Sequence, residues 1–375
     1  MSDDLSLLPS ELGEDLRGTV REVLADRCDP AAVVAMGDGD DGVLEPLWRS
    51  VAVDLGLAGL LVPESLGGHG VTAREAAVVC EELGAAAAPV PFLTSSVLAT
   101  SVLLAGGAPS QAAGDLLGRL AAGEVTAALV VPWTTSPWAE VPALSESGGD
   151  VRSVAGVVEA DVLLVPVATG DGVEVRAVEV SSAGVTLERV VALDMSRPLA
   201  DVTVDLDADA GEVVVAAAEG AAGVSAALRV AAGMLASEQA GVARAALTRT
   251  VGYLQERHQF GRVVGGFQAL KHRLADVYVE AEGASASAAW AAAALADLEG
   301  GDEEVALAVA VAGAACAESA VHAAEEMVQL HGGIAMTWEH PAHLLLKRAK
   351  ADELALGTPE AYRTVVASLA DLPPG

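Results

Sequence analysis

The period of the hydrophobic pattern changes twice along the 375-residue chain, and these changes limit the folds that it can adopt. Apolar residues recur at helical spacing from residue 10 to about 120, alternate with polar residues from about 121 to 214, and return to helical spacing from Gly220 onward. A period of two is typical of half-buried strands, and a period near 3.6 is typical of amphipathic helices. The sequence therefore predicts an α+β chain, mostly α, with an N-terminal helical domain over residues 1–120, a middle antiparallel β-domain over 121–214 and a C-terminal helical bundle over 215–375.

The N-terminal region contains a helical stripe and a clear helix start. Five apolar residues at i, i+3, i+4, i+7 and i+11 form the stripe: Leu44, Leu47, Trp48, Val51 and Leu55. Further along, Thr72 followed three residues later by Glu75 forms the pattern of a capping box. We predict a helix from Ala73 to Leu83 that ends at Gly84.

The middle and C-terminal regions show the two other patterns. Four valine-rich stretches bounded by Gly, Ser and Pro predict antiparallel strands: residues 126–132, 160–168, 172–180 and 200–206. Two apolar triplets at i, i+4 and i+7 predict two long bundle helices: Leu247, Val251 and Leu254, and Leu270, Leu274 and Val277. The many alanines favour helix and allow neighbouring helices to approach closely.

Charge and composition argue against several classes of protein. The formal net charge of −32 repels nucleic-acid phosphates, so we expect no nucleic-acid partner. Mean hydropathy is +0.44, but the apolar run over residues 284–296 is too short to span a bilayer, and the acidic N-terminus has no export signal, so we expect a cytoplasmic protein without a membrane segment. Three distant cysteines, Cys28, Cys80 and Cys316, fit small buried side chains better than a disulfide framework or a zinc site.

Two polar segments interrupt the Ala-rich helical region. In residues 255–276, Arg257 and Gln268 flank a Gly-rich turn, which is either a helix corner with solvated side chains or a site open to a phosphate-bearing ligand. In residues 329–340, the glycine pair allows the backbone to approach a ligand closely. We expect no metal there, because His340 and His343 do not have the i, i+4 spacing of two ligands on one helix face.

Three segments taken together resemble the acyl-CoA dehydrogenase family over essentially the whole chain. They are LGLAGLLVPESLGGHG (residues 55–70), RHQFGRVVGGFQALKHRLAD (257–276) and QLHGGIAMTWEHPAHLLLKRA (329–349). The resemblance implies FAD as cofactor, an acyl thioester on CoA or a carrier protein as substrate, and a C-terminal four-helix bundle. It also implies an oligomer, usually a dimer of dimers.

The resemblance assigns cofactor contacts to individual residues. Arg257 and Phe260 match family positions that contact the pyrophosphate and adenosine portion of FAD across a subunit interface, and Gln268 matches the glutamine that follows them. A second set matches the Q-x-x-G-G turn, which touches the FAD of the neighbouring subunit: Gln329, Leu330, His331, Gly332 and Gly333.

The family's catalytic base is a glutamate that removes the α-proton while hydride leaves the β-carbon. The two family positions of this base fall on Leu356 and Ala231 here, and neither side chain accepts a proton. Glu238 lies about two helical turns beyond Ala231, in an apolar run where an ionised carboxylate is costly unless it is paired or functional. Two interpretations stay open: Glu238 is the catalytic base, or it is an ion-paired or solvated helix residue.

The middle region also departs from the family pattern. Thr134, Thr135 and Ser136 are candidate hydrogen-bond donors in the segment that corresponds to the family's flavin-contacting loop. The next flavin-contacting strand is several residues shorter here, at Gly156. We therefore carry three hypotheses: a self-sufficient flavin-dependent acyl-thioester dehydrogenase, a subunit without a base that serves the FAD site of a similar partner chain, and non-redox thioester chemistry on the same fold.

Overall fold

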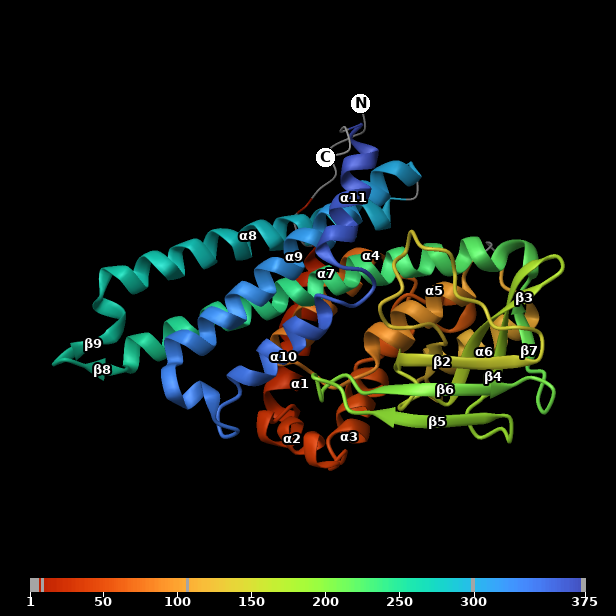
Figure 1. Cartoon of the computed structure of the whole chain (residues 1–375), viewed down its shortest axis with the longest axis horizontal. Helices are drawn as coiled ribbons and strands as arrows, with labels where there is room; N and C mark the ends of the chain where they lie inside the picture. The colour runs from red at the N-terminus through yellow and green to blue at the C-terminus, as the bar shows by residue number, and fades with distance from the viewer. Residues whose placement is uncertain (1–6, 8–9, 106–107, 298–300, 372–375) are drawn as a thin grey trace.

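The computed structural model describes residues 7, 10–105, 108–297 and 301–371 of the chain. The strands β1–β7 lie at one end of the molecule, and the hairpin β8–β9 protrudes at the opposite end. Helix α7 runs between the two ends, and α8 and α9 lie beside the half of α7 that leads to the hairpin (Figure 1). The expected order of a helical part, a sheet part and a helical bundle is confirmed. The domain limits at residues 120/121 and 214/215 stay a prediction.

The N-terminal part consists of short and medium helices: α1 (Glu11–Arg27), α2 (Pro30–Ala35), α3 (Leu44–Arg49), α4 (Ala73–Ala86), α5 (Thr100–Leu103) and α6 (Gln111–Ala121). Two π-helical segments continue this set: Ser50–Asp54 after α3 and Phe92–Ala99 before α5. The predicted stripe is confirmed, because its members are all buried or half-buried: Leu44, Leu47, Trp48, Val51 and Leu55. The predicted capping box of Thr72 and Glu75 is also present at the start of α4.

The prediction that this helix ends at Gly84 is wrong. Helix α4 continues to Ala86, and Ala87 ends it in the left-handed conformation with φ 48°. Gly84 instead allows α4 to contact α7 (Ala217–Glu256), since a Cβ on Gly84 would lie 2.1 Å from the carbonyl oxygen of Glu238. The two helices therefore cross in backbone contact, which is possible only because this position has no side chain.

The middle part contains two packed sheets. One sheet has the order β1 (Ala127–Leu129), β3 (Val162–Thr169), β4 (Gly172–Glu179) and β7 (Glu212–Val215), and the other has the order β2 (Gly148–Ala155), β6 (Leu199–Asp205) and β5 (Val185–Val190). Apolar side chains from both sheets meet in one buried cluster, as in a β-sandwich. The expected antiparallel pairing is confirmed for β3 with β4, but it is wrong for β1, which pairs in parallel with β3. The predicted strand β6 pairs antiparallel with β2 and β5, two strands that the sequence did not predict.

The C-terminal part is a helical bundle built around α7. Its other elements are β8 (His258–Gln259), β9 (Arg262–Val263), α8 (Gln268–Ala296), α9 (Asp302–His331), α10 (Ala342–Asp352) and α11 (Pro359–Leu369). Helix α7 packs against α4, α8, α9 and β4, so it contacts all three parts of the molecule. The two predicted amphipathic helices are confirmed as α7 and α8.

The helical stretches Ala217–Glu256 and Asp302–Met336 are long and apolar enough to cross a membrane by length and composition alone. In each of them 67% of the apolar window is buried inside the protein, as in the core helices of a bundle.

The three cysteines are buried and unpaired, and burial raises the pKa of Cys28 to about 11 and that of Cys316 to about 12.

Candidate functional site

The Gly-rich segment after α7 forms the protruding end of the bundle. Arg257 ends α7, and its carbonyl oxygen accepts a hydrogen bond from the N–H of Val264 at 2.8 Å, which closes the β8–β9 hairpin. At the tip, Phe260 adopts the left-handed conformation with φ 52° and is 90% exposed. Among the described residues no carboxylate pairs with Arg257, so its guanidinium group is available to an anion.

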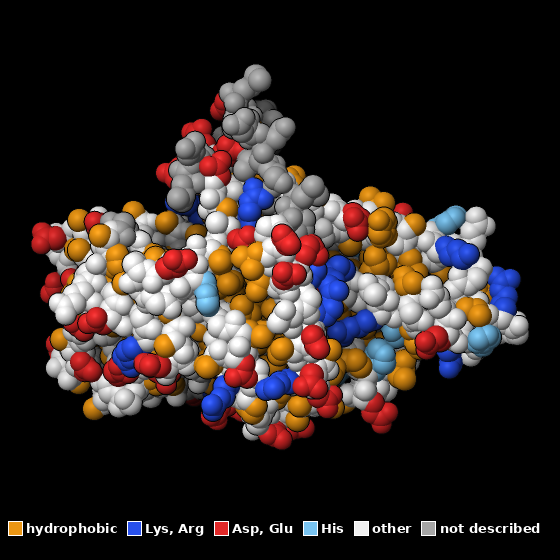
Figure 2. Space-filling view, turned by 180° about the vertical axis from the view of Figure 1, so that it is seen from behind, with side chains coloured by type: hydrophobic (Ala, Val, Ile, Leu, Met, Phe, Trp, Pro, Cys, Tyr) orange, Lys and Arg blue, Asp and Glu red, His pale blue; other side chains and the backbone are white. Residues whose placement is uncertain are grey.

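Positive charge is concentrated in this same segment. Residues 257–275 hold four basic residues and no acidic one: Arg257, Arg262, Lys271 and Arg273, of which Arg273 pairs with Glu326. Lys, Arg and His side chains gather at this end of the molecule in the view from behind (Figure 2). Gln268 begins α8 here and is exposed, with its Nε2 3.4 Å from Nε2 of His272. In a chain of net charge −32, this end is the region that attracts an anionic ligand.

The predicted glycine turn lies where α9 ends. Gly332 has φ 67° and ψ −147°, a conformation that is open essentially to glycine alone. A Cβ added to Gly332 or Gly333 would meet nothing within 4 Å, so the backbone of this turn is open to a close approach from outside. Gln329 is exposed as well, and Leu330 is half-buried.

His331 differs from its neighbours in the turn because its ring points inward. It is buried, its Nδ1 lies 2.7 Å from the carbonyl oxygen of Met327, and burial lowers its pKa. Its ring stacks on Tyr253 with centroids 4.3 Å apart. Since Tyr253 belongs to the last turn of α7, this contact connects the α9 turn with the segment that carries Arg257. The two sequence motifs are thereby held at the same end of the bundle.

The residues at this end fit the pyrophosphate portion of FAD. A pyrophosphate is bound by cations and by backbone that can approach it closely. Arg257 offers the cation, and the Gly332–Gly333 turn offers backbone without a side chain in the way, while the N–H of Gly332 already donates to the carbonyl oxygen of Gln329. Both features face outward, as expected if they complete a cofactor site on another subunit. Among the described residues, no group of three or more His, Cys, Asp and Glu side chains could hold a metal ion.

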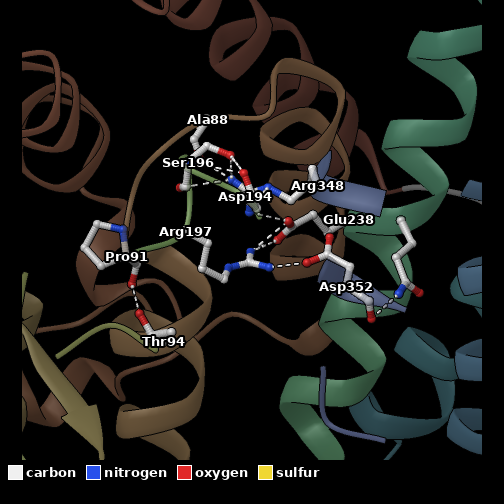
Figure 3. A network of polar contacts seen from close by, with 10 residues as sticks. Ala88, Pro91, Thr94, Asp194, Ser196, Arg197, Glu238, Arg348 and Asp352 are labelled. Carbon is white, nitrogen blue, oxygen red and sulfur yellow. Dashed lines mark hydrogen bonds and ion pairs between the residues drawn. The ribbon is translucent and has the colours of Figure 1, made fainter. Parts of the chain in front are cut away.

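Glu238 lies in the second region of interest, a buried ion cluster between the three parts of the molecule. Both of its carboxylate oxygens accept hydrogen bonds from Nη2 of Arg197, at 2.8 and 2.7 Å, and Oε1 also accepts one from Nη1 of Arg348 at 2.8 Å. Both guanidinium groups are directed at this carboxylate (Figure 3). The side chain is only 3% exposed, so the interpretation of Glu238 as a solvated helix residue is excluded.

The rest of this cluster balances the two arginines. We call the set the junction cluster: Asp194, Arg197, Glu238, Arg348 and Asp352. Nε of Arg348 lies 2.9 Å from Asp194, and Nη1 of Arg197 donates to Asp352 at 2.5 Å. Arg348 also donates to the carbonyl oxygen of Ala88, which follows α4. Arg197 comes from the β5–β6 loop of the middle part, and Glu238 and Arg348 come from α7 and α10 of the C-terminal part. The hydrogen bond from Arg348 to Ala88 adds the N-terminal part, so the cluster joins all three parts of the molecule.

Burial and pairing set the protonation of this cluster. Burial alone would raise the pKa of Glu238, but the charges of Arg197 and Arg348 hold it below its ordinary value. Burial raises the pKa of Asp352 well above its ordinary value, against the opposing charge of Arg197. The two arginines thus favour the ionised form of Glu238 at the centre of the cluster, and a carboxylate with a lowered pKa is a weak base.

The positions that the family resemblance gives for the base are sealed and apolar. Ala231 and Leu356 are both 0% exposed. Leu356 has φ 55°, donates its N–H to the carbonyl oxygen of Trp133 at 2.9 Å and accepts a hydrogen bond from the Tyr362 hydroxyl at 2.9 Å. The left-handed conformation is costly for leucine, and these two hydrogen bonds hold it in place.

The three side chains of the middle part that are candidate hydrogen-bond donors to the flavin differ in their exposure to solvent. Thr134 is exposed, Thr135 is buried, and Ser136 is half-buried beside Gly357. The short β2–β3 connection contacts the N-terminal part directly, since a Cβ on Gly156 would lie 2.6 Å from Thr94. The assignment of Thr134, Thr135 and Ser136 as flavin contacts stays a prediction.

Sequence reasoning missed four members of the junction cluster, all except Glu238. One local signal could have revealed part of it: Arg348 and Asp352 are four residues apart on α10 and share a face with the buried residue Leu345. A charged pair on an apolar face indicates buried ionic contacts. Arg197 carries no comparable signal, because it lies in an irregular loop.

Comparison with known proteins covers nearly the whole chain. Residues 10–124 match the profile described as acyl-CoA dehydrogenase, N-terminal domain, and residues 218–369 match the profile described as acyl-CoA dehydrogenase, C-terminal domain. The chain is 36% identical over 357 residues to acyl-CoA dehydrogenase IpdE2 of Mycobacterium tuberculosis, a match that covers 94% of this chain and 95% of the relative.

Two solved structures of related complexes share the fold. The ChsE4–ChsE5 complex of Mycobacterium tuberculosis matches with TM-score 0.83 and 27% identity, covering 98% of this chain and 100% of the other. A variant of the Tcur3481–Tcur3483 steroid ACAD matches with TM-score 0.81 and 28% identity, covering 96% of this chain and 98% of the other. Homologues described as acyl-CoA dehydrogenases bind FAD.

Proposed function

Because this chain belongs to the acyl-CoA dehydrogenase family, whose members are flavin-dependent oxidoreductases acting on CH–CH bonds, we propose that it works as one subunit of a heteromeric acyl-CoA dehydrogenase. In this proposal the chain completes the FAD site of a similar partner chain, and the partner provides the catalytic base. The observation that carries the proposal is the buried leucine, Leu356, at the position of the family base, in a chain that keeps an open cationic bundle end.

In the proposed complex the bundle end binds and orients the cofactor. Arg257 places a cation against the pyrophosphate, and Gly332 and Gly333 let the backbone approach it without a side chain in the way. FAD bound there would supply the hydride acceptor for the β-carbon of the substrate. The α-proton passes to a carboxylate of the partner chain, because neither Leu356 nor Ala231 accepts a proton.

Two of these structural relatives favour a heteromer that acts on steroid-derived substrates. ChsE4–ChsE5 is a complex of two different chains, and Tcur3481–Tcur3483 is described as a steroid ACAD. We propose a CoA thioester with a bulky alicyclic acyl group as the substrate class. Location in the cytoplasm also stays a prediction.

The second candidate is a self-sufficient dehydrogenase with Glu238 as its base. Glu238 is buried as an active-site base can be, but both of its oxygens accept hydrogen bonds from arginines and its pKa is lowered. A base that removes an α-proton at neutral pH benefits from a pKa near the working pH. We therefore prefer a structural role for Glu238.

A turnover assay on the complex separates the two candidates. The chain is co-expressed with an acyl-CoA dehydrogenase-like partner that has glutamate at the position of Leu356, and oxidation of a steroid side-chain CoA thioester is followed with a dye acceptor. We expect that replacing the partner's glutamate by glutamine abolishes turnover, whereas Glu238→Gln in this chain leaves kcat of the folded complex within about twofold. Abolished turnover in a folded, flavin-loaded Glu238→Gln complex would instead make Glu238 the base.

A further inference from the structure

The position where the family places its base is enclosed by a closed ring of contacts. The N–H of Leu356 donates to the carbonyl oxygen of Trp133 at 2.9 Å, and the Trp133 ring lies under the guanidinium group of Arg197, 5.4 Å from ring centroid to Cζ. Arg197 donates a hydrogen bond to Asp352. Asp352 is the last residue of α10 and lies four residues before Leu356 in the chain, which completes the ring. The carbonyl oxygen of Asp352 is itself fixed, because it accepts a hydrogen bond from Nε2 of Gln239 on α7 at 3.0 Å.

Every member of this ring is withdrawn from solvent. Leu356 is 0% exposed, and Trp133 is 7% exposed. The side chains of Arg197 and Asp352 are 10% and 0% exposed. A substrate that reacts at this position must bring its α-carbon beside the side chain of residue 356. Such an approach requires breaking the backbone hydrogen bond to Trp133 and displacing a buried arginine that is already paired.

The turn around Leu356 is packed on its other side as well. Tyr362 donates its hydroxyl hydrogen to the Leu356 carbonyl and meets Trp138 edge-on, with ring centroids 5.6 Å apart. A Cβ on Gly357 would lie 3.6 Å from both Ser136 and Tyr362, which is ordinary contact distance. The loop that carries Trp133 and the turn that carries Leu356 are thus in contact on both faces.

We infer that a charged structural core has taken the place of an acyl-thioester cavity in this chain, so that the junction between its three parts binds no acyl-CoA. The junction cluster fastens the β5–β6 loop, α7 and α10 together, and the Leu356 turn seals the remaining space against the Trp133 loop. This inference deepens the proposed function, on which it rests for the identity of the reaction, because it explains why the thioester must be held by the partner chain.

The test restores the family base by Leu356→Glu. In a sealed core the new carboxylate has no cation to pair with, because both terminal nitrogens of Arg197 already donate to Glu238 and Asp352. We expect Tm to fall by more than about 5 °C at pH 7, and to recover as the pH is lowered and the carboxyl group takes up a proton. Leu356→Met is the matched control, since it keeps an apolar side chain of similar volume, and it leaves Tm nearly unchanged.

A different result for Leu356→Glu is expected if the junction is an open cavity. If this junction is an acyl cavity that has merely lost its base, Leu356→Glu folds with a Tm close to that of the unsubstituted chain and gains dehydrogenase turnover. That outcome would overturn the inference.

A measurement on the unsubstituted chain covers the case in which Leu356→Glu does not fold. Hydrogen exchange of the Leu356 amide is followed with and without a large excess of crotonyl-CoA. We expect exchange only through global unfolding and no change in rate on adding the thioester. Exchange through a local opening, or a rate that changes with crotonyl-CoA, would contradict a sealed junction. This readout concerns one amide of this chain and holds whether or not a partner chain is found, whereas the proposed function fails if no complex with a partner oxidises a thioester.

Discussion

The bundle end and the domain junction use arginine in opposite ways. At the bundle end Arg257 is exposed and unpaired by any described carboxylate, so folding leaves it hydrated and ready for an anionic ligand. In the junction Arg348 is 2% exposed and donates to two carboxylates and to backbone oxygens, as a buried cation must. The same residue type therefore serves binding in one region and the connection of domains in the other, and only its surroundings decide which.

The largest expected difference between the regions concerns stability. Arg348→Met leaves Glu238 and Asp194 each without one cation in a buried site, so we expect the free energy of unfolding to fall by about 3–5 kcal/mol. Arg273→Met is the control, because its ion pair with Glu326 lies on the surface and contributes at most about 1 kcal/mol. Urea unfolding of both variants measures the contrast, and equal losses would mean that the junction cluster has no special structural role.

The contribution of Glu238 to the free energy of unfolding is expected to depend on pH. Its pKa is lowered in the folded chain, so the stabilisation that its charge provides is complete above the unfolded-state pKa of about 4.3 and is lost as the pH falls through the folded value. Glu238→Gln should therefore cost about 2 kcal/mol at pH 7 and progressively less below pH 4.

The companion variant for this comparison is Asp352→Asn. Burial raises the pKa of Asp352 and that of Glu238 is lowered, so the charge of Asp352 contributes less to stability, and Asp352→Asn should cost less than Glu238→Gln does at pH 7. Chemical unfolding over a pH series compares the two. A cost of Glu238→Gln that grows as the pH falls would show that Glu238 is not held ionised by the arginines.

How far the sequence predicts each region depends on the range of the interactions involved. The start of α4 was predictable because Thr72 and Glu75 form a local capping box. The continuation of α4 beyond Gly84 was not, since that glycine is required by the backbone of α7, more than 150 residues away in the chain. The parallel pairing of β1 with β3 depends in the same way on a partner strand that period-two alternation does not identify.

The residues of the candidate site also differ in this respect: those in local motifs could be predicted, and those defined by long-range contacts could not. Arg257, Gln268 and the Gly332–Gly333 turn could be found from sequence, because each lies in a contiguous motif. Glu238 could be flagged as unusual, since it is an acid within an apolar run. Its pairing with Arg197 and Arg348 could not be predicted, because those residues come from a loop of the sheet part and from α10.

At the bundle end, the expected effect is on the cofactor and not on folding. Arg257→Ala removes a cation from the proposed pyrophosphate contact, so FAD affinity of the complex should fall by about tenfold or more, with stability unchanged within about 0.5 kcal/mol. Arg152→Ala, an exposed arginine on β2, is the matched control and should leave FAD affinity unchanged. Flavin fluorescence on dilution follows the loss, and equal FAD affinity in both variants would remove Arg257 from the cofactor site.

The smallest expected effect concerns a carboxyl group outside both regions. One oxygen of Glu159, in the β2–β3 connection, is buried without a hydrogen-bond partner in the described structure, and burial raises the pKa of this residue to about 7. A raised carboxyl pKa lowers stability increasingly as the pH rises from the unfolded value towards the folded one. Glu159→Gln should therefore add about 1–2 kcal/mol above pH 7 and nothing at pH 4.

Glu140→Gln is the control for Glu159→Gln, since Glu140 is exposed and its replacement should not alter stability at either pH. Thermal unfolding at pH 4 and pH 8 distinguishes the two variants. A loss of stability on Glu159→Gln at pH 8 would show that its carboxylate has a favourable partner there.

The flavin content of the purified protein tests the central claim most directly. The visible absorbance spectrum and the ratio of flavin to chain are measured for this chain alone and for its complex with a base-carrying partner. The account predicts a colourless chain alone and about one flavin for every two chains in the complex. A yellow chain that holds close to one flavin by itself and oxidises an acyl-CoA would contradict it.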